Sequence, residues 1–258
     1  QMLILNDIYT SFNKGTVDEM QLFKGFDFEV NKGDFISIVG SNGSGKTTLL
    51  NLICGTLAPD SGKIIFEGRD ITGLSEHKRA RFIGRVFQDP KMGTCSNLTV
   101  LENFAIADNK GKLFGLAGAV SKKRIDYYRE LLAQCNMGLE DRMNTPVGNL
   151  SGGQRQAIAL VISGMTDVDL LILDEHTAAL DPKSSETVME LTDKLVKQNN
   201  MTAVMVTHNL RFATDFGNRM VMMHGGEAIF DKSGTEKQSV TVNDLLGIFN
   251  EISIECGN

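Results

Sequence analysis

The sequence contains few cysteines, and they are widely spaced. Its 258 residues include four of them, Cys54, Cys95, Cys135 and Cys256. They show neither the close spacing of metal ligands nor the density of a small scaffold held by disulfides. We therefore expect reduced thiols in a cytosol.

Long apolar runs and an excess of basic residues are also missing. No stretch reaches the ~20 consecutive apolar residues of a membrane span, and the first residues lack the basic-then-apolar pattern of a secretory segment. We therefore expect any membrane association to go through a partner. The net charge of −6 argues against binding of phosphate backbones as the main task, because that affinity comes from clustered Lys and Arg. We expect no nucleic acid partner.

The composition is that of a globular protein. Hydrophobic residues make up 41% and charged residues 22% of the chain, which is enough apolar material for a large core. Chains of this length in α/β folds are often single units. We expect one domain with subdomains.

Two kinds of strand are predicted by their hydrophobic patterns. Alternating apolar and polar residues indicate half-exposed antiparallel strands at 2–10, 22–30 and 63–67. Short, continuously apolar runs indicate parallel strands buried on both faces at 35–40, 170–175 and 203–208. Helical patterns lie between the apolar runs, so the sequence predicts an α/β fold around a parallel sheet.

Residues 98–165 have helical spacing and no strand-like run, so they are predicted to form a helical insert, with a Gly-rich piece at 109–118. The basic triplet at 122–124 opens one of its helices. A solvated helix face is the favoured interpretation of this triplet, and contact with nucleic acid is the alternative. From about residue 232 the pattern predicts a loop followed by a terminal helix.

The stretch GSNGSGKT, residues 40–47, is a phosphate-binding loop pattern in the expected context, with an apolar strand before it and a helix after it. Glycines let backbone amides face a phosphate, and the helix N-terminus adds partial positive charge. Lys46 is predicted to bridge the β- and γ-phosphates, and Thr47 to place its hydroxyl on Mg²⁺. The predicted nucleotide-binding residues here are Gly40, Ser41, Asn42, Gly43, Ser44, Gly45, Lys46, Thr47 and Thr48.

Asp174, Glu175 and His176 follow the apolar run at 170–173. Alone, this triplet fits a metal hydrolase, an acid/base pair or a nucleotide hydrolase. Downstream of a phosphate loop, an acid at the end of a buried strand indicates nucleotide hydrolysis, with Asp174 on Mg²⁺ and Glu175 polarising the attacking water. Zinc is disfavoured because the histidine spacing of a helical zinc site is absent.

LSGGQ, residues 150–154, is the third motif. Ser151 suits a helix N-cap, and Gly152 and Gly153 leave backbone amides uncovered, so this helix start is a second candidate phosphate site. With the phosphate loop before it and LLILDE after it, the sequence resembles the ATP-binding cassette ATPase of ABC transporters from about residue 3 to 230.

The resemblance implies the fold and its division. It implies a single ABC ATPase domain over 1–258, a P-loop NTPase of RecA-like type with a parallel sheet, an N-terminal antiparallel β subdomain and an inserted α-helical subdomain. The nucleotide-binding core would comprise 1–97 and 166–231, the helical signature subdomain 98–165, and the tail helix 232–258.

The resemblance also implies residue roles. Phe12 matches the aromatic residue that stacks on adenine, with packing of an edge strand as the alternative. Gln88 matches the glutamine that senses Mg²⁺ and the attacking water and links the core to the helical insert, with a surface amide after a strand as the alternative. His208 matches the histidine that contacts the γ-phosphate and orients Glu175 and water. Ser151, Gly152, Gly153, Gln154 and Asp181 would reach the ATP of a second subunit. For Asp181, which precedes Pro182, a helix N-cap is the alternative, and the two roles are compatible. Glu175, His208, Gln88 and Lys46 are thus the catalytic candidates, and Thr47, Gln88 and Asp174 the metal candidates.

The sequence departs from the family pattern at two places. His176 stands where proline is usual, and a packing role is favoured over a catalytic one because Glu175 and His208 already occupy the required positions. The helix after the signature reads IALVISGM and lacks a common arginine, so the contacts of that arginine are not carried over.

The implied function is an ATP- and Mg²⁺-dependent ATPase subunit. Its implied partners are a second copy of itself, a membrane permease and, through the complex, an extracytoplasmic binding protein. The implied location is the cytoplasmic face of the membrane. Import of a small solute, with amino acids as candidates, is favoured. Lipoprotein release, export, cell-wall signalling or a soluble nucleic-acid-associated ATPase are the alternatives.

Overall fold

The chain folds into two compact units, each described here by itself. A computed structural model describes residues 1–109, 122–166 and 168–255. Unit 1 comprises Gln1–Arg81 with Met201–Asn258, and unit 2 comprises Phe82–Asn200. Parallel strands, flanking helices and a separate antiparallel sheet confirm the predicted α/β class.

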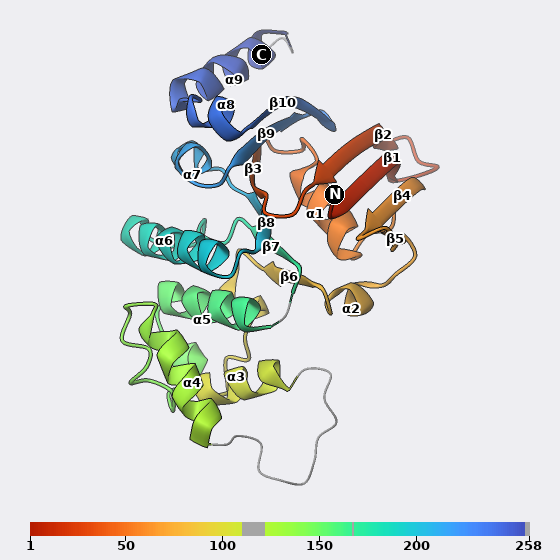
Figure 1. Cartoon of the computed structure of the whole chain (residues 1–258). Helices are drawn as coiled ribbons and strands as arrows, with labels where there is room; N and C mark the ends of the chain where they lie inside the picture. The colour runs from red at the N-terminus through yellow and green to blue at the C-terminus, as the bar shows by residue number, and fades with distance from the viewer. Residues whose placement is uncertain (110–121, 167, 256–258) are drawn as a thin grey trace. The chain divides into compact units, whose positions relative to one another are not determined.

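Unit 1 contains an antiparallel sheet in the order β2-β1-β4-β5 (Figure 1). Its strands are β1 (Leu3–Phe12), β2 (Met20–Val30), β4 (Ser61–Phe66) and β5 (Arg69–Asp70). Leu3 pairs with Val30 on one side and with Phe66 on the other. The three alternating patterns therefore correspond to antiparallel strands, as predicted.

A second group of strands in unit 1 carries the phosphate loop. In the order β10-β9-β3-β8, these strands are β10 (Glu227–Ser233), β9 (Arg219–His224), β3 (Phe35–Gly40) and β8 (Thr202–Val206). Every residue of β3 and β8 is buried, and the two strands pair in parallel with Ile36 opposite Val204. Burial on both faces explains their uninterrupted apolar sequences.

The helices of unit 1 are short except for the first and the last. They are α1 (Lys46–Cys54), α2 (Glu76–Arg79), α7 (Leu210–Asp215), α8 (Gly234–Gln238) and α9 (Val242–Glu255). The predicted loop from about residue 232 is wrong in part, because β10 continues to Ser233 and α8 follows. Lys237, 3% exposed, donates hydrogen bonds to the carbonyls of Thr214 (2.6 Å) and Phe216 (2.8 Å), which hold α8 in place. The predicted terminal helix is α9, and residues 256–258 lie outside the described residues.

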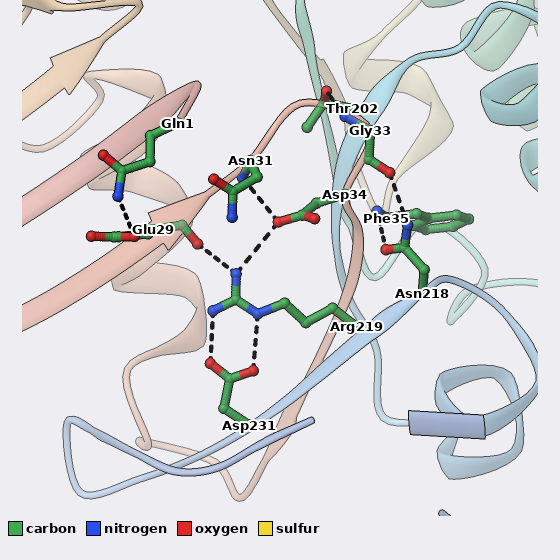
Figure 2. Close-up of polar contacts among 10 residues, drawn as sticks. All are labelled: Gln1, Glu29, Asn31, Gly33, Asp34, Phe35, Thr202, Asn218, Arg219 and Asp231. Carbon is green, nitrogen blue, oxygen red and sulfur yellow. Dashed lines mark hydrogen bonds and ion pairs between the residues drawn. The ribbon is translucent and has the colours of Figure 1, made fainter. Parts of the chain in front are cut away.

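An ion-pair network holds the start of β3 (Figure 2). Arg219 of β9 donates two hydrogen bonds to Asp231 of β10, at 2.9 and 2.7 Å, and one to the carbonyl of Glu29, at 2.7 Å. A weaker contact of 3.4 Å reaches Asp34. The carboxylate of Asp231 raises the pKa of Arg219, so the guanidinium stays charged.

Asn218 completes this anchor. Its side chain accepts from the amide of Phe35 at 2.8 Å and donates to the carbonyl of Gly33 at 2.9 Å, while the hydroxyl of Thr202 accepts from the amide of Gly33 at 3.0 Å (Figure 2). These bonds satisfy the amide of Phe35 and the amide and carbonyl of Gly33 outside the hydrogen-bond ladder between strands. The strand that leads to the phosphate loop is therefore fixed at its first residue.

Unit 2 consists of two parallel strands and a set of helices. Its elements are β6 (Ile83–Val86), η1 (Pro90–Met92), α3 (Val100–Asp108), α4 (Lys122–Ala133), η2 (Val147–Asn149), α5 (Gly152–Met165), β7 (Leu170–Asp174) and α6 (Pro182–Gln198). The strands β6 and β7 pair in parallel, with Ile83 opposite Leu170. The described residues within 98–165 form helices and no named strand, as predicted. Unit 2 also holds β6, β7 and α6, so the subdomain boundaries given above stay a prediction.

Three smaller expectations can be compared with the structure. Lys122 and Lys123 are exposed, and Arg124 donates to Asp108 at 2.6 Å, so the basic triplet forms a solvated and internally paired face. The cysteines at 54, 95 and 135 are free thiols, whereas Cys256 and most of the Gly-rich piece lie outside the described residues. Within the described ranges, no helix is both long and apolar enough to cross a membrane.

Candidate functional site

In unit 1 the phosphate loop runs from β3 to α1 and depends on glycine. A Cβ on Gly40 would lie 2.3 Å from the carbonyl oxygen of Met223, and Gly45 has a φ of 106° with the ring of Phe23 3.0 Å from its ideal Cβ. Gly45 is also the N-cap of α1, where it offers no side chain to the first helical amides. Those amides are suited to an anion.

Two polar side chains of the loop are buried where a phosphate would bind. Lys46, 5% exposed, donates to the carbonyls of Gly40 at 2.7 Å and Ser41 at 2.9 Å. The hydroxyl of Ser44, 2% exposed, has no hydrogen-bond partner among the residues that the structure describes. A buried cation beside an unsatisfied hydroxyl and open helix amides fits a phosphate group. Ser41, Asn42, Gly43 and Thr47 are exposed and Thr48 is half-buried.

A cavity of about 380 Å³ opens beside this loop. The residues that line it are Val39, Gly40, Ser41, Asn42, Thr207, His208, Leu210 and Phe249. The predicted histidine and the phosphate loop are therefore brought together within unit 1. Phe249 was not predicted. It belongs to α9, which packs through the fully buried Leu245 against a cluster that includes Val39 of β3.

Phe12 is separate from this cavity. It is the last residue of β1, is half-buried and pairs with Met20 of β2. It is not among the cavity-lining residues. Its role in stacking on adenine stays a prediction.

In unit 2 the acidic residues lie where β7 ends. Asp174 is the last residue of the strand, and its carboxylate accepts from Arg85 of β6 at 2.6 Å. Glu175 follows with φ at 48°, a left-handed conformation that is uncommon for a residue with a side chain. The strand ends at Asp174, directly before this residue. Both are half-buried.

His176 is an interior residue. It is 1% exposed, and its Nε2 lies 2.9 Å from the hydroxyl of Thr192 on α6. That hydroxyl donates its only proton to the carbonyl of Val188 at 2.8 Å. It must therefore accept in its bond with His176, and Nε2 of the histidine carries the proton. Burial lowers the pKa of His176 to about 3. A neutral, buried imidazole supports the favoured packing role.

The signature segment begins α5 in the predicted way. Ser151 is the N-cap, and it forms a capping box in which its hydroxyl accepts from the amide of Gln154 at 3.2 Å. A Cβ on Gly153 would lie 3.0 Å from that of Ser184, so α5 and α6 approach closely at this glycine. Asp181 caps α6 by accepting from the amide of Ser184 at 3.0 Å, with Pro182 at the first helical position. The predicted caps are confirmed, and roles toward ATP stay predictions.

Gln88 is exposed and lies two residues after β6. The preceding residue, Phe87, accepts a hydrogen bond at 2.8 Å from Gln156, a fully buried residue of α5. The segment that carries Gln88 is therefore attached directly to the signature helix. A physical link of this kind suits the predicted role of Gln88.

Sequence reasoning missed two residues of the candidate site. Arg85 could have been suspected, because a charged residue within the strand IGRV needs a partner when its neighbours are buried. Phe249 gave no such signal, since an aromatic residue on a terminal helix ordinarily indicates core packing. Only the docking of α9 shows that it lines the cavity.

Comparisons with known proteins agree with this geometry. Residues 23–178 match the family described as ABC transporter. A tyrosine transport ATP-binding protein of Clostridioides difficile is 43% identical over 96% of this chain and 98% of its own. A lipoprotein-releasing system ATP-binding protein of Caulobacter vibrioides is 34% identical over 81% of this chain and 87% of its own. A dimeric ATP-binding cassette, solved in a post-hydrolysis state with ADP and Pi, is 28% identical with a TM-score of 0.74, over 90% of this chain and 98% of its own.

Proposed function

The chain belongs to the ABC transporter family and is an ATP-binding cassette ATPase, and we propose that it drives a membrane permease as one subunit of an ATP-dependent dimer. The predicted family, fold, ATPase activity and use of ATP and Mg²⁺ are confirmed by these matches. The dimer, the permease, the cargo and the individual residue roles belong to the proposal.

In unit 1 we assign the phosphate loop to the β- and γ-phosphates. Lys46 and the amides at the start of α1 supply positive charge, and the unsatisfied Ser44 hydroxyl supplies a further donor. We assign His208 to contacting the terminal phosphate, and its position in the lining of the same cavity as Ser41 and Asn42 supports this assignment. Phe12 is assigned to the adenine face.

In unit 2 we assign Glu175 to polarising the attacking water, and Asp174 and Gln88 to holding Mg²⁺. In unit 1 we assign the hydroxyl of Thr47 to the same ion. Oxygen ligands of this kind suit Mg²⁺, which uses few protein ligands besides nucleotide phosphates. When bound, the ion neutralises charge that develops on the phosphates. Glu175 stands directly after the strand in a left-handed backbone conformation, whereas Asp174 is the last residue of the strand, and this difference supports separate roles for the two acids.

The signature segment supports the dimer. Ser151 is exposed at the N-terminus of α5, a helix of 14 residues, and Gly152 beside it is only half-buried. Such a helix start can bind the phosphates of ATP held by a second copy. The similar cassette structure bound to ADP and Pi is itself dimeric.

Replacing Glu175 by Gln tests the roles of Glu175 and of the dimer together. Glu175→Gln keeps the size of the side chain and removes the base. ATP should therefore bind without being hydrolysed, and the dimer should accumulate. Size-exclusion chromatography with light scattering would measure the fraction of dimer, and release of phosphate would measure ATP turnover. Full turnover by the variant would remove Glu175 from the mechanism, and a variant that stays monomeric with bound ATP would contradict the dimer.

We further propose an amino acid importer, with tyrosine as the first candidate cargo and an extracytoplasmic binding protein in the complex. The observation that carries this is the 43% identity, over nearly the full chain, to a tyrosine transport ATP-binding protein. Lipoprotein release is the second candidate because of the 34% identical relative. With either candidate, we propose that the chain works at the cytoplasmic face of the membrane.

Uptake by cells distinguishes these candidates. A strain that lacks this chain should take up labelled tyrosine more slowly than its parent, and the wild-type chain but not Lys46→Ala should restore uptake. Labelled alanine and tryptophan would show how selective the system is. Normal tyrosine uptake in the deletion strain, with lipoproteins retained in the inner membrane, would replace import by lipoprotein release.

A further inference from the structure

The carboxylate assigned to the metal is already occupied by an arginine. Asp174 accepts a hydrogen bond from Arg85 at 2.6 Å, and the two side chains are only 16% and 12% exposed. An ion pair this shielded from solvent interacts more strongly than one on the open surface. The charge on Arg85 is permanent, because a guanidinium does not lose its proton in proteins.

The strand register makes the pair a built feature of the fold. In the parallel ladder Arg85 is opposite Ile172 and Val86 is opposite Leu173. Alternate residues of a strand point to the same face, so Ile172 and Asp174 share a face, and Arg85, opposite Ile172, lies on the same face of the ladder. The guanidinium also lies over the ring of Phe87, with its central carbon 4.9 Å from the ring centre. Packing on Phe87 and pairing with Asp174 together restrict the arginine to one place.

We propose that Arg85 competes electrostatically with Mg²⁺ for Asp174 and so sets how strongly nucleotide binding depends on the ion. This inference rests on the proposed role of Asp174 as a metal residue. A fixed positive charge at a carboxylate oxygen lowers the gain in free energy when a divalent cation approaches the same carboxylate. The pair satisfies Asp174 without the metal and raises the Mg²⁺ concentration needed to load it.

Nucleotide affinity with and without the metal measures this effect without any turnover. A fluorescent non-hydrolysable ATP analogue would be titrated into the full chain at saturating free Mg²⁺ and again in EDTA. The ratio is the dissociation constant in EDTA divided by the dissociation constant with Mg²⁺, so a larger ratio means a stronger dependence on the ion. Arg85→Met should increase this ratio about tenfold, which corresponds to ~1.4 kcal/mol of relieved repulsion. Arg85→Lys keeps the charge and should leave the ratio near that of the wild type.

Two further variants locate the effect. Asp174→Asn should shrink the ratio, and Arg85→Met added to Asp174→Asn should change it no further. If Arg85→Met does not unfold cooperatively in circular dichroism, Arg85→Gln, which removes the charge but can still donate to Asp174, takes its place.

The outcomes separate this inference from the proposed function. An unchanged ratio in the neutral Arg85 variants, alongside a reduced ratio in Asp174→Asn, overturns the competition but keeps Asp174 as a metal residue. A ratio that falls in Arg85→Met as it does in Asp174→Asn means that Arg85 orients the carboxylate for the metal, and this also overturns the competition. A ratio unaffected by Asp174→Asn removes Asp174 from the metal site.

Discussion

At the scale of single residues, the bond between His176 and Thr192 predicts a loss of stability. Thr192→Val keeps the shape of the side chain but leaves the Nε2 proton of a buried imidazole unsatisfied. We expect the free energy of unfolding to fall by about 1–3 kcal/mol, the cost of a buried unpaired polar group. Urea denaturation would measure it. Thr192→Ser retains the hydroxyl as the control, and equal stability of the two variants would contradict the bond.

The cysteines give a second prediction at this scale. Cys135 is 4% exposed, and burial raises the pKa of its thiol to about 11, whereas Cys95 is exposed. Because the thiolate is the reactive form, iodoacetamide at pH 8 should modify Cys95 well before Cys135. Mass spectrometry of peptides at timed intervals would follow both. Modification of Cys135 at the same rate in the folded chain would show that the turn after α4 opens readily.

Individual side chains were predictable from the sequence where a motif fixes their chemistry. The capping residues Ser151 and Asp181 followed from local pattern, because a cap depends on residues only three positions away. The partner of Arg85 could not be predicted in the same way. It comes from a strand 89 residues further along the chain, and only the pairing register brings the two together.

At the scale of elements, Arg79 is predicted to hold together several turns of unit 1. It is 1% exposed, and its guanidinium donates to five carbonyls at 2.6 to 3.0 Å, those of Leu52, Ile53, Ile71, Thr72 and Leu74. Leu52 and Ile53 belong to the last turn of α1, whose carbonyls have no partner within the helix. Burial lowers the pKa of Arg79, yet a guanidinium remains charged.

Removing this guanidinium should therefore be costly. Arg79→Met should lower the free energy of unfolding by at least about 3 kcal/mol, because several buried carbonyls lose their donors together. Arg79→Lys should fall in between, since an ammonium has fewer donors. Arg81→Met, at an exposed arginine two residues away, is the matched control and should change stability by less than about 0.5 kcal/mol. Chemical denaturation of all three would decide, and an Arg79→Met variant as stable as the control would refute this role.

Most strands and helices could be predicted from the spacing of hydrophobic residues. The elements that could not be predicted in this way have physical causes. Buried strands such as β3 and β8 were predictable because burial on both faces demands continuous apolar residues. The short helix α8 was not, since its residues, GTEKQ, carry no apolar pattern. It depends on the buried ammonium of Lys237, which binds carbonyls of a different segment. Arg79 likewise stands in the polar stretch EHKRAR and looks like a surface residue in the sequence.

At the scale of the whole molecule, the exposed start of α5 allows a test of how two copies share their sites. Lys46→Ala disables the phosphate loop, and Ser151→Arg blocks the signature segment. Ser151 is the better signature position to change, because its side chain is exposed, whereas a Cβ at Gly153 would press on Ser184. The loss of the cap should cost about 1 kcal/mol, which a folded domain tolerates.

Each variant alone should lack ATP turnover, since every site would contain one defective part. A mixture of the two should regain turnover, because a mixed dimer pairs the intact phosphate loop of one copy with the intact signature of the other. The matched control mixes Lys46→Ala with the double variant Lys46→Ala/Ser151→Arg, and it contains no intact loop. Steady-state phosphate release measures both variants alone and both mixtures. If the first mixture is as inactive as the control, each copy uses its own signature segment and the shared-site dimer is wrong.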